Sequence, residues 1–333
     1  MRASAIFTPA PIETSPLKLI ELDVPSPGKG EILVRVLACG VCRTDLHVSE
    51  GDLPPRHPRI VPGHEVVGVV ERPGPGASRF GSGERVGIAW LRETCGICVY
   101  CRRGDENLCP NARFTGYDHD GGYAEYAVVR EEFAYRLPPQ LGVEETAPLL
   151  CAGIIGFRAL KRAGVKPDTT VGLYGFGGSA HIAMQVAKYW GCRVYVMTRG
   201  GKHREHAKEL GADWVGTAQE RPPRPLDSAI MFAPAGELVP QALEALDQGG
   251  ILAIAGIYLS PIPALDYERH LFHEKELRSV TANTRADGEE FLELAAKISI
   301  RTTTIAFGLD QANQALQMLK HDELKGAGVL RIA

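Results

Sequence analysis

The chain has 333 residues, of which 44% are hydrophobic and 23% are charged, and its formal net charge is −3. This length exceeds one ordinary core and predicts two domains of a globular protein. The acidic balance argues against a nucleic-acid partner, and the apolar runs are too short for a membrane span. The N-terminal segment lacks the continuous apolar core of a signal peptide, so we expect a cytoplasmic protein.

The first 150 residues are predicted to be rich in strands and turns. Runs at 31–38 and 65–72 are apolar or alternating in the manner of β-strands, and they lie among clusters of glycine and proline. This pattern predicts a β-rich first domain.

Three possible metal ligands are scattered along the chain: Cys42 in ACGVCRTDLH, His64 in PGHE and Cys151 in LLCAG. A single cysteine of this kind is usually a small core residue. Two cysteines and one histidine that leave a fourth position open form a pattern typical of catalytic zinc. Taken with their local contexts, the three residues predict an open zinc site.

Four of the eight cysteines follow the spacing Cys-x2-Cys-x2-Cys-x7-Cys and are Cys95, Cys98, Cys101 and Cys109. The short gaps let the backbone turn around one ion, and the longer gap returns a fourth thiolate to about 2.3 Å from it. An iron–sulfur cluster is the main rival, but its final gap is three residues rather than seven. We therefore predict zinc. A site closed by four thiolates has no position for substrate, so its role is structural.

From about residue 150, strand-like runs alternate with helical patterns. The runs lie at 169–176, 193–198, 228–234 and 251–257, and the helical patterns at 179–191, 203–212 and 237–250. This rhythm predicts a parallel sheet with helices on both faces. Two more helical stretches follow in the tail, at 289–298 and 309–319.

The segment GFGGSA at 175–180 follows a predicted strand and opens a predicted helix, which is the context of a dinucleotide-binding turn. Gly175 permits the tight turn, Gly177 lets the backbone approach a pyrophosphate, and Ala180 replaces the usual third glycine. The N–H groups near Gly178 and Ser179 at the helix start suit phosphate.

The end of the next predicted strand bears on the choice between NAD and NADP. An NAD site usually presents a carboxylate there, but no acidic residue occurs from Ser179 through Arg204. Basic and hydroxyl side chains take its place, namely Thr198, Arg199, Lys202 and Arg204. We therefore favour NADP(H) over NAD(H), with a solvated basic turn beside a weakly bound NAD as the alternative.

The motifs GVCRTDLH, PGHE, the four-cysteine segment, DGGYAEY and GFGGSA occur in the order found in zinc-dependent alcohol dehydrogenases of the medium-chain dehydrogenase/reductase family. The chain resembles the compact microbial members over essentially its whole length. The resemblance implies an α/β protein with a doubly wound Rossmann domain at 151–284. It also implies a β-rich, GroES-like catalytic domain at 1–150, which carries the structural-zinc lobe and to which 285–333 returns.

The resemblance further implies site residues and two zinc ions per subunit. Cys42, His64 and Cys151 match the ligands of catalytic zinc, and Cys95, Cys98, Cys101 and Cys109 match those of structural zinc. Glu65 matches a carboxylate that can approach the metal, and Asp45 matches one that orients the ligand histidine. Thr44 is expected to bind the substrate oxygen, His47 to pass its proton to solvent, and Arg43 to contact the pyrophosphate.

The expected reaction is hydride transfer between a primary or unhindered secondary alcohol and NAD(P)+. Trp90 and Ile257 are candidates for the substrate pocket, with core packing as the competing interpretation. A polyol or cinnamyl-type dehydrogenase shares nearly all these motifs, and a non-catalytic cofactor-binding structural protein is the alternative from another class. A zinc-free quinone reductase needs no Cys42–His64–Cys151 set. We also expect a homodimer or homotetramer with no nucleic-acid or membrane partner.

Overall fold

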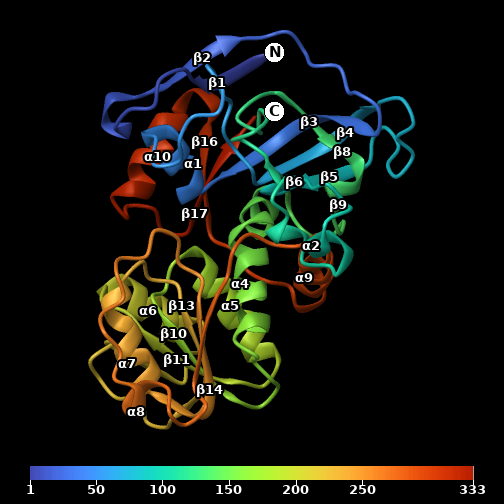
Figure 1. Cartoon of the computed structure of the whole chain (residues 1–333). Helices are drawn as coiled ribbons and strands as arrows, with labels where there is room; N and C mark the ends of the chain where they lie inside the picture. Colours follow the sequence, from blue (N-terminus) through green and yellow to red (C-terminus); the bar gives the residue numbers. More distant parts are fainter. Residues whose placement is uncertain (333) are drawn as a thin grey trace. The chain divides into compact units, whose positions relative to one another are not determined.

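The computed structural model describes residues 1–332, and the chain divides into two compact units (Figure 1). Unit 1 comprises Met1–Ile154 and Ala282–Ala333, and unit 2 comprises Ile155–Thr281. The sequence boundaries were placed at residues 150 and 284. Within the described part of the chain, every helix is too short or too polar to cross a membrane.

Unit 1 is built on a seven-stranded sheet in the order β16-β17-β3-β4-β5-β9, with β8 also paired to β3. All its pairs are antiparallel except β16 with β17. The strands are β3 (Glu31–Val41), β4 (Val66–Pro73), β5 (Arg85–Ile88), β8 (Tyr126–Arg130), β9 (Ala134–Arg136), β16 (Thr304–Gly308) and β17 (Ala327–Arg331). The two predicted strands of this region are therefore present as β3 and β4.

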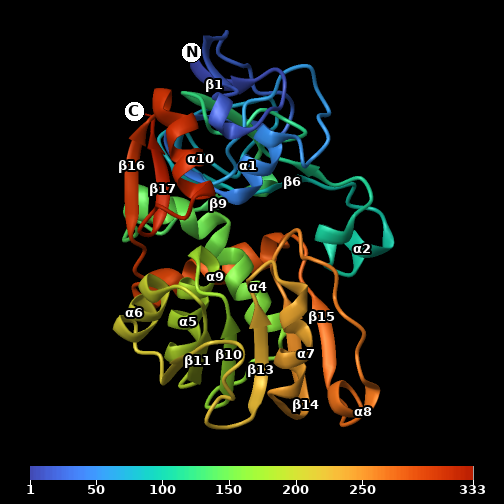
Figure 2. The ribbon, with the colours of Figure 1, turned by 90° about the vertical axis from the view of Figure 1, so that its left-hand side faces the viewer.

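Smaller elements surround that sheet. Two short antiparallel pairs are β1 (Arg2–Ile6) with β2 (Leu17–Glu21) and β6 (Leu91–Glu93) with β7 (Arg113–Phe114). The helices of unit 1 are α1 (Arg43–Glu50), α2 (Val99–Arg102), α3 (Val143–Thr146), α9 (Arg285–Ile298) and α10 (Ala312–Lys320). Helix α10 buries Ala315 and Leu316 in the core of unit 1, and Figure 2 shows it beside β16 and β17.

The tail was expected to contain two helices, and the structure adds strands β16 and β17. Each is only five residues long, and β17 takes its place by pairing with β3, nearly 300 positions earlier in the chain. A short apolar run of this kind has no local signal for a strand, because its partner strand decides its conformation.

Unit 2 is a six-stranded parallel sheet in the order β12-β11-β10-β13-β14-β15, which is the order of a Rossmann fold. Its strands are β10 (Thr170–Tyr174), β11 (Arg193–Met197), β12 (Trp214–Gly216), β13 (Leu226–Met231), β14 (Leu246–Ile254) and β15 (Glu276–Ser279). Its helices are α5 (Gly178–Tyr189), α6 (Gly201–Glu209), α7 (Val239–Glu244) and α8 (Tyr267–His270), while α4 (Ala152–Arg162) enters it from unit 1. Figure 1 shows α5 on one side of the sheet and α7 on the other, so the predicted doubly wound fold is confirmed.

The helix predicted at 237–250 was too long. Helix α7 ends at Glu244, and β14 starts two residues later, where Leu246 pairs with Leu226. A glycine at position 249 with a φ of +71° gives the strand an irregular start. Because Leu243 and Leu246 are both buried, their spacing imitates one helix face across the helix–strand junction.

Candidate functional site

One short helix, α1, carries several of the predicted site residues. Cys42 is its N-cap, and the Asp45 carboxylate accepts the Cys42 backbone N–H at 2.9 Å. The helix ends at Gly51, whose N–H donates to the carbonyl of His47 at 3.1 Å. Both ends of the helix are thus fixed, and Thr44 lies between them on the same rigid element.

A cluster of possible metal ligands forms where α1 meets two other segments of unit 1. One ligand atom from each of Cys42, His64, Glu65 and Cys151 lies within 4.8 Å of those of the others. His64 and Glu65 directly precede β4, and Cys151 directly precedes α4. The Sγ atoms of Cys42 and Cys151 are 3.8 Å apart. Packing therefore brings together residues more than 100 positions apart, as the open-site hypothesis requires.

The imidazole of His64 is held by one nitrogen and leaves the other one available. Its Nδ1 lies 2.9 Å from Asp45 Oδ1, and its Nε2 is buried and makes no hydrogen bond with any of the described residues 1–332. A buried polar atom without a partner is costly, so an orphaned Nε2 beside two thiols is the mark of a ligand position. Asp45 also accepts the Gly63 N–H at 3.0 Å and lies 3.4 Å from the Tyr123 hydroxyl. The donor set fits a zinc ion.

The charges within the cluster favour the metal-binding form of Cys42. A hydrogen bond from the Cys151 thiol lowers the pKa of Cys42 well below its usual range. Burial alone lowers the pKa of His64, but Asp45 and then Cys42 outweigh it and raise this pKa well above its ordinary value. Burial raises the pKa of Glu65, and the nearby Cys42 charge adds to the effect. A thiolate ready at Cys42 is the form that binds zinc.

Gly40 makes room for the buried carboxylate of Glu65. A Cβ atom at position 40 would lie 1.8 Å from Glu65 Oε2, which is closer than atoms can approach. The backbone N–H of Gly40 also donates to the Glu65 carbonyl at 2.9 Å. The sequence analysis did not select Gly40, because nothing in the local pattern places it opposite Glu65.

Four more predicted residues of unit 1 lie on α1 or close to the cluster. Thr44 Oγ1 is 3.9 Å from Cys42 Sγ. The His47 Nδ1 atom is 2.7 Å from Asp52 Oδ2, a partner that the sequence analysis missed because no local motif marks it. The Trp90 ring meets the His64 ring edge-on, with centroids 5.1 Å apart and planes at 74°. Arg43 is exposed at the start of α1.

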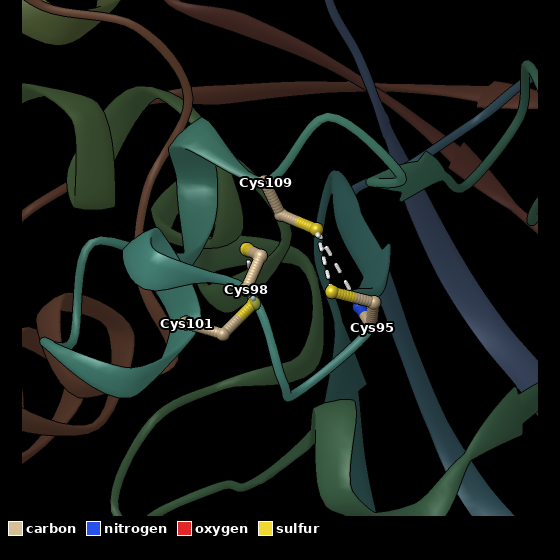
Figure 3. A group of neighbouring side chains, drawn as sticks. All are labelled: Cys95, Cys98, Cys101 and Cys109. Carbon is tan, nitrogen blue, oxygen red and sulfur yellow. Dashed lines mark hydrogen bonds between the residues drawn. The ribbon is translucent and has the colours of Figure 1, made fainter.

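The four-cysteine segment folds into a separate lobe around α2. Figure 3 shows its sulfur atoms as two facing pairs, with Cys95 3.6 Å from Cys109 and Cys98 3.5 Å from Cys101. All four Sγ atoms lie within 4.8 Å of one another. Backbone N–H groups of Ile97 and Cys98 lower the pKa of Cys95 to about 6, whereas burial raises that of Cys109 to about 11. The geometry fits one closed metal site.

This lobe has little apolar packing of its own. Ile97 is 72% exposed and Val99 is 64% exposed, so the metal is the main source of cohesion available to it. One buried carboxylate ties the lobe to the start of α9: Glu106 accepts hydrogen bonds from the Arg285 backbone N–H at 2.8 Å and from Arg285 Nη2 at 2.6 Å. The Arg285 guanidinium also lies 4.5 Å above the Phe133 ring.

In unit 2, the glycine-rich turn lies between β10 and α5. Gly175 has a φ of +88°, and a Cβ there would lie 2.9 Å from the Ala233 N atom, so both the turn and the space require glycine. At Gly177, by contrast, a Cβ would meet nothing within 4 Å. Gly178 and Ser179 form the first turn of α5, where their N–H groups have no helical acceptor. The strand order reverses at β10, which is where dinucleotides bind in this type of sheet.

The predicted basic turn follows β11. Thr198 is buried, and its N–H donates to the Gly216 carbonyl at 2.9 Å, while Arg199 and Lys202 are exposed and Arg204 is half-buried. Tertiary structure adds a carboxylate here that the sequence did not reveal. The backbone N–H and the Ser260 hydroxyl lower the pKa of Glu237, and Arg199 contributes a smaller effect. Ile257 is 49% exposed.

Comparison with known proteins places both units in one kind of enzyme. Residues 28–139 match the model of the alcohol dehydrogenase GroES-like domain, and residues 178–297 match that of the zinc-binding dehydrogenase. The chain is 55% identical over 337 aligned positions to the probable alcohol dehydrogenase AdhA of Mycobacterium tuberculosis, covering 100% of this chain and 97% of that protein. The expected GroES-like unit is therefore confirmed.

Solved structures also resemble the whole chain, two alcohol dehydrogenases among them. A cobalt- and zinc-bound thermostable alcohol dehydrogenase from Pyrobaculum aerophilum superposes with a TM-score of 0.90 at 30% identity, covering 100% of this chain and 99% of that chain. A cinnamyl alcohol dehydrogenase from Sorghum bicolor gives a TM-score of 0.90 at 27% identity, covering 99% and 97% respectively.

Proposed function

This chain belongs to the zinc-binding alcohol dehydrogenases of the medium-chain family, and on that premise we propose that Cys42, His64 and Cys151 hold the zinc at which its alcohol substrate is oxidised. The observation that carries the proposal is the His64 ring: its buried Nε2 makes no hydrogen bond within residues 1–332, and the ring offers a ligand atom within 4.8 Å of those of Cys42 and Cys151. Three nitrogen and sulfur ligands leave a fourth position for substrate, with Glu65 as the neighbouring carboxylate.

Cys95, Cys98, Cys101 and Cys109 hold the second, structural zinc in this proposal. Their four sulfur atoms lie within 4.8 Å of one another, and four thiolates would complete the tetrahedral shell of one zinc ion and leave no position for a reactant. The lobe is linked to the rest of unit 1 through Glu106 rather than through a shared ligand.

Oxidation of an alcohol removes a hydride from carbon and a proton from oxygen. Zinc, when bound, supplies Lewis acidity that makes the substrate hydroxyl more acidic. The chain's residues then have to conduct the proton. In our proposal the Thr44 hydroxyl, beside Cys42, accepts a hydrogen bond from the substrate hydroxyl and gives up its own proton in turn, and His47 passes that proton toward solvent. Asp52, which faces His47 Nδ1, keeps a proton on that nitrogen and leaves Nε2 as the acceptor.

For the nicotinamide cofactor, Arg43, Gly175, Gly177, Gly178 and Ser179 are the proposed pyrophosphate contacts. The open space at Gly177 and the N–H groups at the start of α5 support this assignment.

We favour NADP(H) because exposed basic residues and the buried Thr198 stand where an NAD site presents a carboxylate. Glu237, near Arg199, is the feature that favours NAD(H) instead, since a carboxylate can accept the ribose hydroxyls. An Arg199→Ala variant separates the two: under our proposal it raises the KM for NADP+ while leaving that for NAD+ unchanged. Equal effects on both cofactors would contradict the NADP preference.

The proposed substrates are primary alcohols and unhindered secondary alcohols, and their aldehydes or ketones in reverse. Trp90 supports this choice, because its bulky ring stands beside His64. The assignment of Ile257, which is half exposed in unit 2, to the substrate pocket stays a prediction. A cinnamyl-type or polyol dehydrogenase is the alternative within the family, and the likeness to the Sorghum bicolor enzyme favours the cinnamyl-type over the polyol one.

The deciding experiment is a turnover assay with NADP+ and NAD+ over a graded series of alcohols, with zinc measured on the same sample. We expect two zinc ions per chain and turnover that fails when the more labile ion is removed. Full zinc content without turnover of any alcohol would instead support a cofactor-binding structural protein. The homodimer or homotetramer implied by the family stays a prediction that light scattering on the purified protein tests.

A further inference from the structure

The ring of Trp90 is held by two other aromatic rings in unit 1. It stacks on Phe114 with centroids 4.8 Å apart and planes at 14°, and it lies near Tyr117 at 6.1 Å and 20°. It meets the His64 ring in a T-shaped contact. Offset stacking of this kind resists tilting, so these two neighbours determine how close the indole stands to the metal cluster.

Both neighbours depend on one buried carboxylate, that of Asp118, whose side chain is only 2% exposed. Its Oδ2 accepts the backbone N–H of Phe114 at 2.9 Å, which fixes the strand β7 that carries this ring. Its Oδ1 accepts Arg56 Nη1 at 2.5 Å and lies 3.4 Å from Arg113 Nη1. A carboxylate buried to this degree is tolerable only when it is paired in this way.

Arg56 connects the Asp118 carboxylate to the Tyr117 ring. The Arg56 guanidinium lies 4.6 Å from the centre of the Tyr117 ring and covers its face. The Tyr117 hydroxyl donates to the Pro54 carbonyl at 2.8 Å, so the ring is also held at its far end. A guanidinium that is fixed by a carboxylate keeps its cation–π contact with an aromatic face better than one that moves freely in solvent.

We propose that Asp118 is a positioning residue for substrate selection, because it holds Phe114 and Tyr117, and through them Trp90, against the metal cluster. The proposal rests on the proposed function in one respect, namely that Trp90 borders the space for substrate. Asp118 does not touch the cluster ligands. It makes the wall formed by Trp90 rigid, and a rigid wall rejects branched and bulky alcohols.

The variant Asp118→Asn separates the two bonds of this carboxylate. The amide oxygen still accepts the Phe114 N–H, but the charge that holds Arg56 is lost. Because the Arg56 side chain is 43% exposed, it can turn into solvent at low cost, and it then uncovers Tyr117. We expect the Trp90 ring to become more mobile while strand β7 keeps its structure.

Asp120 offers a matched control in the same loop. Its Oδ2 accepts Arg59 Nη2 at 2.7 Å and its Oδ1 accepts the Val61 N–H at 2.9 Å, the same chemistry as at Asp118. Its arginine, however, is not stacked on a neighbour of Trp90. Asp120→Asn therefore removes an aspartate–arginine pair whose carboxylate is more exposed, at 38%, and leaves the aromatic stack intact.

The test compares kcat/KM for a linear and a β-branched primary alcohol in the zinc-loaded enzyme. We expect Asp118→Asn to raise the branched-to-linear ratio on the order of fivefold, as a loosened apolar wall allows, and Asp120→Asn to leave it unchanged. Arg56→Met should reproduce the Asp118→Asn effect and Arg56→Lys only part of it, because lysine keeps the charge but not the planar group. Equal ratios in the Asp118 and Asp120 variants would overturn the proposal.

A second readout does not depend on turnover. The chain has three tryptophans, so the Trp90 emission is obtained as the difference from a Trp90→Phe variant. We expect this emission to shift and its anisotropy to fall in Asp118→Asn and Arg56→Met, but not in Asp120→Asn. If even the unmodified enzyme oxidises no alcohol, the proposed function fails while the emission still decides the role of Asp118. If Asp118→Asn does not fold, Arg56→Met decides it, and an unchanged Trp90 signal there sinks the idea.

Discussion

The two cysteine clusters of this protein reach similar donor sets by opposite routes. The four-cysteine cluster, called the knot below, takes its ligands from one segment, Cys95 to Cys109, on a lobe with exposed apolar side chains. The open cluster takes Cys42, His64 and Cys151 from three segments that only the packing of unit 1 brings together. A local motif can therefore specify the knot, whereas the open cluster exists only once the surrounding fold exists.

The two clusters also differ in how their ligands are supported. In the knot, backbone N–H groups of the same loop stabilise the Cys95 thiolate. In the open cluster, a separate carboxylate, Asp45, holds both the Cys42 backbone and the His64 ring. The first device serves cohesion, and the second sets the direction of a ligand at a position where a reactant can bind. Four predictions test this contrast.

The largest effect is expected from His64→Ala. Removing the only imidazole of the open cluster should lower kcat/KM by a factor of about a thousand or more, since the Lewis acid accounts for several kcal/mol of the barrier. Zinc content should fall from two ions to one per chain. Elemental analysis together with steady-state kinetics checks this. A variant that keeps both ions and most of its activity would contradict a catalytic role of the open cluster.

The next effect concerns the knot. In Cys98→Ser we expect the lobe to lose its order, with amide protection at residues 95–109 falling to the level of an unfolded loop. Turnover should drop on the order of tenfold at most, because the lobe supplies no ligand to the open cluster. Hydrogen exchange followed by mass spectrometry measures both regions in one sample. Loss of protection around β4 instead would mean that the two sites are not separable.

A more selective effect, confined to the open cluster, is expected from Asp45→Asn, which keeps the shape of the side chain but removes the charge facing His64. Loss of such a support typically costs about 10- to 100-fold in metal affinity or activity. Competition with a chelator should show weaker binding of the labile zinc and unchanged binding of the knot zinc. An equal loss at both sites would indicate general destabilisation rather than a specific support.

The smallest effect concerns a buried histidine that, unlike His64, is not paired with a carboxylate of residues 1–332. His181 in α5 lies 5.7 Å from the His206 ring, and burial lowers its pKa to about 4. The unfolded chain takes up this proton near pH 6.5, so stability is full above that pH and falls as the pH drops toward 4.

Between pH 7 and pH 5 the loss from His181 should be about 2 kcal/mol. Denaturant unfolding of the unmodified chain and of His181→Asn at both pH values measures it. We expect the variant to lose less stability on acidification. Equal losses would show that His181 is already accessible to protons in the folded protein.

Much of the fold follows from patterns along the chain. The strands and helices of the Rossmann unit alternate and are separated by clear turn signals, and GFGGSA marks the turn that precedes α5. The junction of α7 and β14 was mistaken for one helix, because buried leucines at 243 and 246 keep helical spacing across it. Strands β16 and β17 were missed, because their pairing partner β3 lies at the other end of the chain.

The candidate site divides in the same way. The ligands were identifiable because their short motifs occur in a known order. Their supporting partners carried no such signal: Gly40 is defined only by the space that Glu65 occupies, and Asp52 only by the His47 ring that it faces. Glu237 lies in the short helical turn Gly236–Leu238 after β13, far from Arg199 along the chain, so the sequence argument about cofactor choice did not consider it.

By itself, the sequence determined the four-thiolate knot, the dinucleotide turn and the types of residue that can bind metal, because each depends on spacing within about 20 positions. Tertiary structure alone decided that Cys42, His64 and Cys151 meet, that His64 Nε2 is left without a partner, and that Asp118 stands behind Trp90. Burial and distance between remote segments arise only when strands pair and helices pack, and local patterns carry no record of them.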